Sequence, residues 1–317
     1  MLELGPFAAA PFDLLRLFAV PAFVWAAWRD VATRRITNRL WPPLLVLAVF
    51  ALAIEGYDAW LAGGFIWEQF LYVTLLSIGV LIPLAFAFWY FGGFGGADAK
   101  AIMILAVLFP TYPTYVVIDW TFPMVEPAVG VFSLAILTNA VILGLIYPLS
   151  LGVRNAIANE FAWAMFIGRQ IDVSQTVALP GRLLESPEGF DRSGLDLDAL
   201  RMYLSWRGIT IEQLRSDPER YRLSLPDDPG DPGDGAVTDG GEFDDPWGAN
   251  AFLKATDNGA YGTTPETLRE GLEVLAYREV VWYSPGIPFV LLIAAGLLLA
   301  VIYGDLFLSI IEWVAPF

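Results

Sequence analysis

The chain has 317 residues, of which 56% are hydrophobic, and its mean hydropathy is +0.57. Soluble domains are roughly 45–50% apolar, so this excess indicates a membrane protein. Acidic residues outnumber basic ones 34 to 18, which argues against nucleic acid as a partner because phosphate binding needs basic patches. The absence of cysteine and histidine excludes disulfides, thiol nucleophiles, imidazole bases and the usual zinc and haem ligand sets, and we expect no cofactor.

The acidic composition is also poor in lysine. Lys100 and Lys254 are the only two lysines, and the formal net charge is −16. Hydrated, screened carboxylates keep a protein soluble at high salt. The composition therefore predicts a halophile with a salt-rich cytoplasm.

Apolar runs of membrane-spanning length predict an α-helical polytopic membrane protein with six transmembrane helices. The runs cover residues 12–28, 40–55, 69–91, 99–118, 128–150 and 286–303. Pro110 and Pro113 predict a kinked or irregular end for the fourth run. The acidic first five residues, and the arginines after a long first run, predict that no signal peptide is cleaved.

Charge in the loops predicts the orientation. The loop after the first run carries Arg29, Arg34, Arg35 and Arg39, whereas the next loop has three acids and no base. Because positive loops stay in the cytoplasm, the amino terminus is expected outside, and residues 91–100 and 151–285 inside. Arg16 is then the one basic residue on the outer side.

Three parts follow from this layout. Residues 1–150 form transmembrane helices 1–5, residues 151–285 a cytoplasmic acidic insert, and residues 286–317 the last transmembrane helix with the C-terminal tail. Residues 227–246 contain eight acids, no base and many Gly and Pro residues, which predicts a disordered linker.

The rest of the insert predicts a small α+β domain. Helical spacing of apolar residues after Ser193 predicts a helix with that serine as its N-cap. Residues 263–285 predict a helix that begins at a Thr or Pro, followed by a strand rich in Val, Trp and Tyr.

The stretch FGGFGGADAK, residues 91–100, combines four glycines with Asp98 and Lys100. Taken singly, Asp98 suits a helix N-cap, Asp30 a solvated interfacial acid, and Lys100 a cation that reaches the headgroups. Taken together, Asp30 and Asp98 predict a carboxylate pair, because the predicted topology places both on the same membrane face at about the same depth. Two carboxylates can therefore meet there.

A close carboxylate pair has a chemistry of its own. Two such groups cannot both ionise comfortably, so one stays protonated while the other accepts a proton from water. This is the arrangement for aspartic peptide hydrolysis. We expect Gly95 and Gly96 to allow close backbone approach and positive φ angles.

These motifs resemble the archaeal type IV prepilin peptidases, including the preflagellin (prearchaellin) peptidases, within the GxGD group of membrane aspartic proteases. The glycine-rich Asp-x-Lys motif is matched by GGFGGADAK, with Ala97 at the third position of GxGD. The first-aspartate segment is matched by DVATRRITNRL, with Asp30, Ile36 and Asn38. The stretch SPGIPFVLLIAAG before the last run is also similar to the archaeal branch.

The resemblance implies a membrane aspartic endopeptidase without cofactor or metal. It would remove the short charged leader, a class III signal peptide, from pilin and archaellin precursors at the cytoplasmic face of the cell membrane, in contact with membrane lipids, for the type IV pilus and the archaellum. The implied catalytic residues are Asp30 and Asp98. The implied substrate-binding or loop residues are Gly95, Gly96, Ala97, Lys100 and Asn38.

Three alternatives were weighed against this interpretation. A presenilin-like or signal-peptide-peptidase-like protease predicts an aspartate deep within a helix and a Pro-Ala-Leu motif, which the sequence lacks. An ion-coupled transporter would bind a cation with Asp30 and Asp98, but the chain shows no internal repeat. A Ser–Lys peptidase would use Lys100, but no serine lies near it in sequence.

Overall fold

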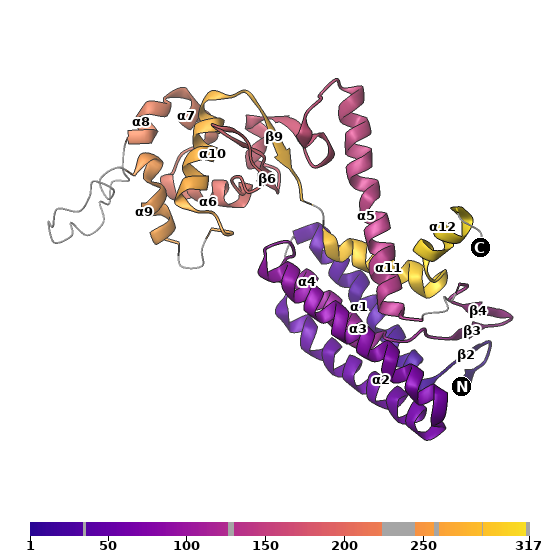
Figure 1. Ribbon diagram of the computed structural model, residues 1–317. Coiled ribbons are helices and arrows are strands. Elements are labelled where there is room, and N and C mark those ends of the chain that lie inside the picture. Colours follow the sequence, from indigo (N-terminus) through magenta and orange to yellow (C-terminus); the bar gives the residue numbers. More distant parts are fainter. Residues whose placement is uncertain (34–35, 126–129, 224–244, 257–259, 287, 315–317) are drawn as a thin grey trace. The chain divides into compact units, whose positions relative to one another are not determined.

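Long apolar helices make up much of the computed structural model. It describes residues 1–33, 36–125, 130–223, 245–256, 260–286 and 288–314. The chain divides into two units, one of Met1–Tyr147 with Pro288–Phe317 and one of Pro148–Ile287. Figure 1 shows the elements of both.

The helices of the first unit carry its apolar character. They are α1 (Pro11–Thr33), η1 (Asn38–Leu40), α2 (Trp41–Ala62), α3 (Gly64–Tyr90), α4 (Gly96–Leu108), most of α5 (Phe132–Ile157), α11 (Phe289–Ile302) and α12 (Leu306–Val314). Among the described residues, α1, η1 with α2, α3 and α5 are long and apolar enough to cross a membrane. The chain is thus a mostly helical, multi-pass membrane protein by length and composition.

The predicted fourth run is wrong in its second half. Helix α4 ends at Leu108, and the chain continues as strand β3 (Tyr115–Val117). Proline lacks a backbone N–H donor and keeps the preceding residue out of the helical region, so the helix ends before Pro110 and the irregular end expected for this run is confirmed. Helix α4 therefore has 13 residues, and α11, with 14, is also shorter than an ordinary span.

A small antiparallel sheet, which the apolar runs did not predict, uses the residues after α4. Its strands are β1 (Leu2–Leu4), β2 (Phe7–Ala9), β3 and β4 (Trp120–Phe122), in that order. Phe7 pairs with Val117 and Ala9 with Tyr115. The sheet joins the amino terminus to the segment after α4.

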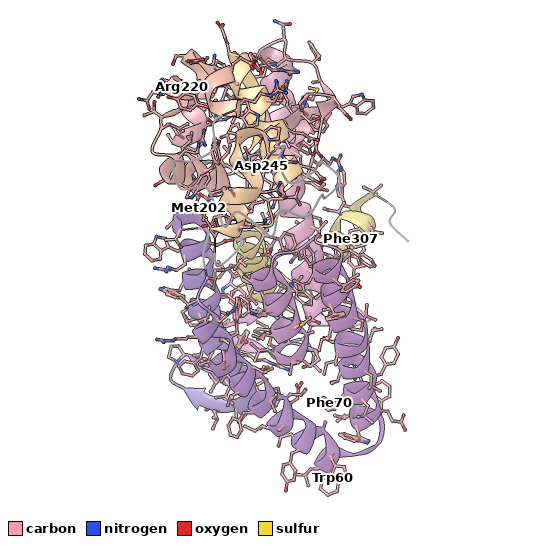
Figure 2. All side chains as sticks on the ribbon, turned by 90° about the vertical axis from the view of Figure 1, so that its left-hand side faces the viewer. Trp60, Phe70, Met202, Arg220, Asp245 and Phe307 are labelled. Carbon is pink, nitrogen blue, oxygen red and sulfur yellow. The ribbon has the colours of Figure 1, made fainter. Side chains whose placement is uncertain are left out.

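Helix α4 is the centre of the first unit. It packs against α2, α3 and α11, while α1 packs against α2 and α11 (Figure 1). Ala101 and Ala106 on α4 are fully buried, and Ile102 and Leu105 join the same apolar core. Small side chains let neighbouring helices approach closely. Unlike these buried side chains of α4, Trp60 is exposed, near the connection between α2 and α3 (Figure 2).

A buried ionic cluster ties α1 to α2 and to the end of α4. The Arg16 side chain is 0% exposed, and its nitrogens lie 2.8 Å from Asp13 Oδ1 and 2.6 Å from Glu55 Oε2. Its Nε also donates to the carbonyl oxygen of Leu108 at 2.7 Å. Thr111 donates its hydroxyl to the other Glu55 oxygen. The guanidinium thus satisfies two carboxylates that would otherwise be buried without a partner.

The second unit combines short helices with small sheets. The first sheet has the order β5 (Arg169–Asp172), β9 (Val280–Ser284), β6 (Arg182–Leu183), and β7 (Glu185–Ser186) pairs with β8 (Gly189–Phe190). The helices are η2 (Trp163–Phe166), η3 (Val173–Val177), α6 (Leu197–Arg207), α7 (Ile211–Ser216), α8 (Pro218–Leu223), η4 (Pro246–Gly248), α9 (Ala249–Lys254) and α10 (Pro265–Tyr277). Tyr203, Trp247 and Phe252 lie in its separate apolar core.

The helix and strand predicted for residues 263–285 are confirmed as α10 and β9, with Thr264 capping α10. The Ser193 cap is wrong: Asp196, directly before α6, accepts the hydrogen bond from the Asp198 N–H at 2.9 Å. Because Asp196 lies directly before α6, its carboxylate reaches the N–H groups of the first turn, whereas Ser193 lies too far back in the chain to be the N-cap.

The predicted linker, residues 227–246, lies outside the described residues except at its last two positions. Asp245 there accepts hydrogen bonds from the N–H groups of Asn250 and Ala251 and pairs with Arg269 at 3.0 Å. This end of the linker therefore belongs to the folded unit.

The Arg16 cluster yields a stability prediction. Arg16→Met should lower the free energy of unfolding by about 3–5 kcal/mol, because removing one partner leaves buried carboxylates uncompensated. The measurement is the midpoint of thermal unfolding in detergent. Arg39→Met is the matched control, since Arg39 is exposed, and it should change the midpoint little. Equal midpoints for the two variants would contradict a stabilising role for the cluster.

Candidate active site

The two aspartates singled out in the sequence lie in the first unit, on different helices. Asp30 is in the last turn of α1, and Asp98 is in the first turn of α4. The negative charge of Asp30 raises the pKa of Asp98. The structure therefore brings the two carboxylates within electrostatic range of each other, across 67 intervening residues.

A hydrogen bond at the N-terminus of α4 holds the Asp98 side chain. The N-cap of α4 is Gly95, whose N–H donates to Asp98 Oδ2 at 3.0 Å. Asp98 is thus not the N-cap, as one sequence interpretation had it, but the third helical residue, reaching back to the cap. The backbone N–H of Val290, near the start of α11, also acts on this carboxylate.

Burial dominates the electrostatics of Asp98, which lies outside the four long apolar helices. The pKa of Asp98 is raised from the ordinary 3.8 to about 6, mainly by burial and in smaller part by the Asp30 charge, against the lowering effects of the N–H groups of Gly95 and Val290. A carboxyl with such a pKa is protonated in about half of the molecules at pH 6 and in about a tenth at pH 7, far more than an ordinary aspartate. The pair can therefore hold one proton while retaining one negative charge.

The glycines before Asp98 serve a different purpose from the one expected. Gly95 has a φ of −66°, and neither it nor Gly96 has a positive φ, which in this turn belongs to Gly92 at +75°. A Cβ on Gly95 would lie 3.0 Å from Asp98 Oδ2, whereas a Cβ on Gly96 would meet only Trp89 Nε1, at 3.8 Å. Gly95 therefore leaves room for the carboxylate that it caps.

An aromatic stack holds the turn in place. The N–H groups of Gly93 and Phe94 both donate to the carbonyl oxygen of Phe88 at the end of α3. The Phe94 ring then lies between the rings of Phe88 and Phe289, at centroid distances of 4.8 and 4.9 Å. This stack joins α3, the glycine turn and the start of α11, next to Val290. No sequence pattern assigns a role to Phe94, Phe289 or Val290, although Phe289 and Val290 lie in the stretch SPGIPFVLLIAAG.

Lys100 and Asn38, which lie far apart in the sequence, form a direct contact. Lys100 Nζ donates to Asn38 Oδ1 at 2.7 Å. Asn38 begins η1, shortly after the helix that carries Asp30, and Lys100 lies two residues beyond Asp98. The contact therefore links the segments of the two aspartates. Ala97, in place of the family glycine, is half-buried and packs against the apolar core.

Within the described ranges, no group of three or more acidic side chains could hold a metal ion.

The long helices and the acid pair from α1 and α4 define a multi-pass membrane protein with a candidate carboxylate dyad. Residues 17–149, which include both aspartates, match the Type IV leader peptidase family. The chain is also 25% identical over 161 residues to the preflagellin peptidase of Methanocaldococcus jannaschii. That alignment covers 47% of this chain and 63% of the relative, so the chain spans less than two thirds of the relative's length. No solved structure matches the chain.

These comparisons confirm the resemblance drawn from the motifs around Asp30 and Asp98. The family match ends at residue 149 and so leaves out most of the second unit.

The raised pKa of Asp98 predicts a pH-dependent stability difference. Since the folded state holds the proton more tightly than the unfolded state, the contribution of Asp98 to stability is fully present below pH 3.8 and lost as the pH rises through about 6. Asp98→Asn keeps a neutral acceptor for the Gly95 N–H. The variant should therefore match the native protein near pH 3.5 and have a higher thermal midpoint at pH 7.5.

The measurement is a series of thermal unfolding curves from pH 3.5 to 8. Asp172→Asn, at an exposed position of the second unit, is the control and should show no such pH-dependent gain. A constant difference between Asp98→Asn and the native protein over the whole range would contradict the titration.

Proposed function

We propose that this chain is a membrane aspartic endopeptidase that removes the short charged leader from type IV pilin-like and archaellin precursors. The observation that carries the proposal is the electrostatic coupling of Asp30 to Asp98 inside the segment that matches the Type IV leader peptidase family. The name of the relative, a preflagellin peptidase, supports the same substrate class.

The proposed mechanism assigns one role to each carboxyl group. Asp98, with a pKa of about 6, is the protonated member and donates its proton to the oxygen of the scissile carbonyl. Ionised Asp30 takes a proton from a water molecule, whose oxygen attacks the carbonyl carbon. When the tetrahedral intermediate collapses, the C–N bond breaks, the amine nitrogen takes the proton from Asp30, and Asp98 regains its proton from the intermediate's hydroxyl.

Residues around the dyad have supporting roles in this proposal. Gly95 keeps the space into which the Asp98 carboxylate fits, and the Lys100–Asn38 contact holds η1 against α4. Gly96 and Ala97 form the first turn of α4 beside the dyad. The leader of a precursor is basic and is followed by an apolar helix. The helix would lie in the bilayer, and the acidic chain would attract the leader over the few ångströms that high salt permits.

The proposed topology has six spans. They are α1, η1 with α2, α3, α4 from Ala99 onward, α5 and α11. At 1.5 Å per residue, the α4 span would be only about 15 Å long and α11 about 21 Å. Burial of α4 among its neighbours supports this arrangement, because a helix enclosed by protein need not match the lipid thickness. The amino terminus would lie outside, and the dyad and the second unit in the cytoplasm.

Asp30→Asn and Asp98→Asn should each reduce precursor cleavage at least about 100-fold, because each removes a proton-transfer group but keeps its shape. Membranes containing each variant are incubated at high salt with a tagged pilin precursor, and the new amino terminus is read by mass spectrometry. Asp172→Asn is the control and should cleave normally.

Near-native cleavage by either dyad variant would contradict its catalytic role. A native protein that leaves pilin and archaellin precursors uncut would overturn the proposed function and favour a cation-binding role for the same aspartates.

The environment of Gly95 predicts an asymmetry between neighbouring glycines. Gly95→Ala should reduce cleavage roughly tenfold or more, since its methyl group would displace the Asp98 carboxylate by a few tenths of an ångström. Gly96→Ala is the matched control and should stay within about twofold of native activity, because the added methyl group makes ordinary contacts. Cleavage rates are compared at equal membrane levels and equal thermal midpoints. Equal activities in the two variants would contradict the role assigned to Gly95.

A further inference from the structure

Large apolar side chains are exposed at the last residue of α5 and in the segment that follows it, within the second unit. Ile157 is 78% exposed, Phe161 71% and Trp163 94%. Aromatic side chains of this size are seldom so open in water, and a cluster of them marks a surface that contacts something apolar. None of these residues takes part in the proposed active site.

The segment that carries them, residues 158–168, is folded back onto α5. Asn155 Nδ2 donates to the carbonyl oxygens of both Met165 and Gly168, each at 2.8 Å. Phe166 packs over Gly152 so closely that a Cβ there would lie 2.4 Å from the ring. The fold-back segment, as we call residues 158–168, therefore keeps Phe161 and Trp163 close to the C-terminal end of the helix.

The length of α5 places this end at the membrane surface. Its 26 residues span about 39 Å at 1.5 Å per residue, against a hydrocarbon core of about 30 Å. Leu145, Leu149 and Val153, at four-residue intervals, are all more than half exposed and lead toward Ile157. The exposed Arg154 follows Val153 directly, in the last turn of α5. The end of α5 thus has the composition of a helix that leaves lipid for the headgroup layer.

We propose that Ile157, Phe161 and Trp163 form an interfacial anchor that inserts into the lipid surface beside the end of α5. Indole and phenyl rings favour the headgroup level, where an apolar ring meets a polar environment. Lipid is the occupant that fits, because the exposed residues continue the apolar stripe of a helix that crosses the membrane. The anchor fixes the depth at which α5 ends.

The test uses the absence of cysteine in the chain. Trp163→Cys and Phe161→Cys are each labelled with an environment-sensitive nitrobenzoxadiazole dye in the full-length protein, reconstituted in phosphatidylcholine nanodiscs. Both labels should emit at shorter wavelength and be quenched at least about threefold more by lipid-attached nitroxides than by dissolved iodide. Glu212→Cys, on the exposed side of α7, is the control and should show the opposite preference.

Two results would overturn the anchor. Iodide quenching of both labels to the extent seen at position 212 would place them in water. Protection from both quenchers would place them against protein, either a second copy of this chain or another partner. Because neither label touches the dyad, the outcome is independent of precursor cleavage.

Discussion

The site depends on one electrostatic constraint: the Asp98 carboxylate is buried where a second carboxylate acts on it. Burial and the Asp30 charge both disfavour the ionised form, whereas the N–H groups of Gly95 and Val290 favour it. The balance leaves the pKa near 6, which suits a group that must give and regain a proton at neutral pH. Three parts of the chain must meet for this balance, namely the end of α1, the start of α4 and the start of α11.

The charged residues at the two ends of α1 lie in different electrostatic environments. Near its beginning, Arg16 lies between Asp13 and Glu55, so the buried charges are compensated by ion pairs and hydrogen bonds. Near its end, Asp30 acts on another acid. Compensated charge stabilises a fold only when the geometry is good, whereas a second carboxylate nearby raises the pKa of a buried acid and favours proton exchange. The first end has the features of a structural element and the second those of a reactive site.

Close packing around the glycine turn explains why the site needs so few polar residues. The Phe88–Phe94–Phe289 stack fixes the turn, and Gly95 admits the Asp98 oxygen at hydrogen-bond distance. The Lys100–Asn38 contact links the same helix to the segment after α1. Each contact joins parts of the chain that no local pattern connects. Geometry is thus imposed on Asp98 from several sides, as a proton-transfer group requires.

Features that depend on composition and on order along the chain can be predicted from the amino-acid sequence. The order of the apolar runs predicts that Asp30 and Asp98 lie at the same membrane face, because each span reverses the side, and the Asp-x-Lys and Ile-x-Asn motifs point to the residues around them. Local patterns likewise determined α10 and β9, where capping and strand signals lie within a few residues of the elements they define. Other features depend on the folded chain: α4 ends at Leu108, Asp196 caps α6, Gly95 leaves room for the Asp98 carboxylate, and Arg16 is buried between two acids. Which of several chemically suitable groups meets a given atom depends on packing between distant segments, and neither periodicity nor charge counting contains that information.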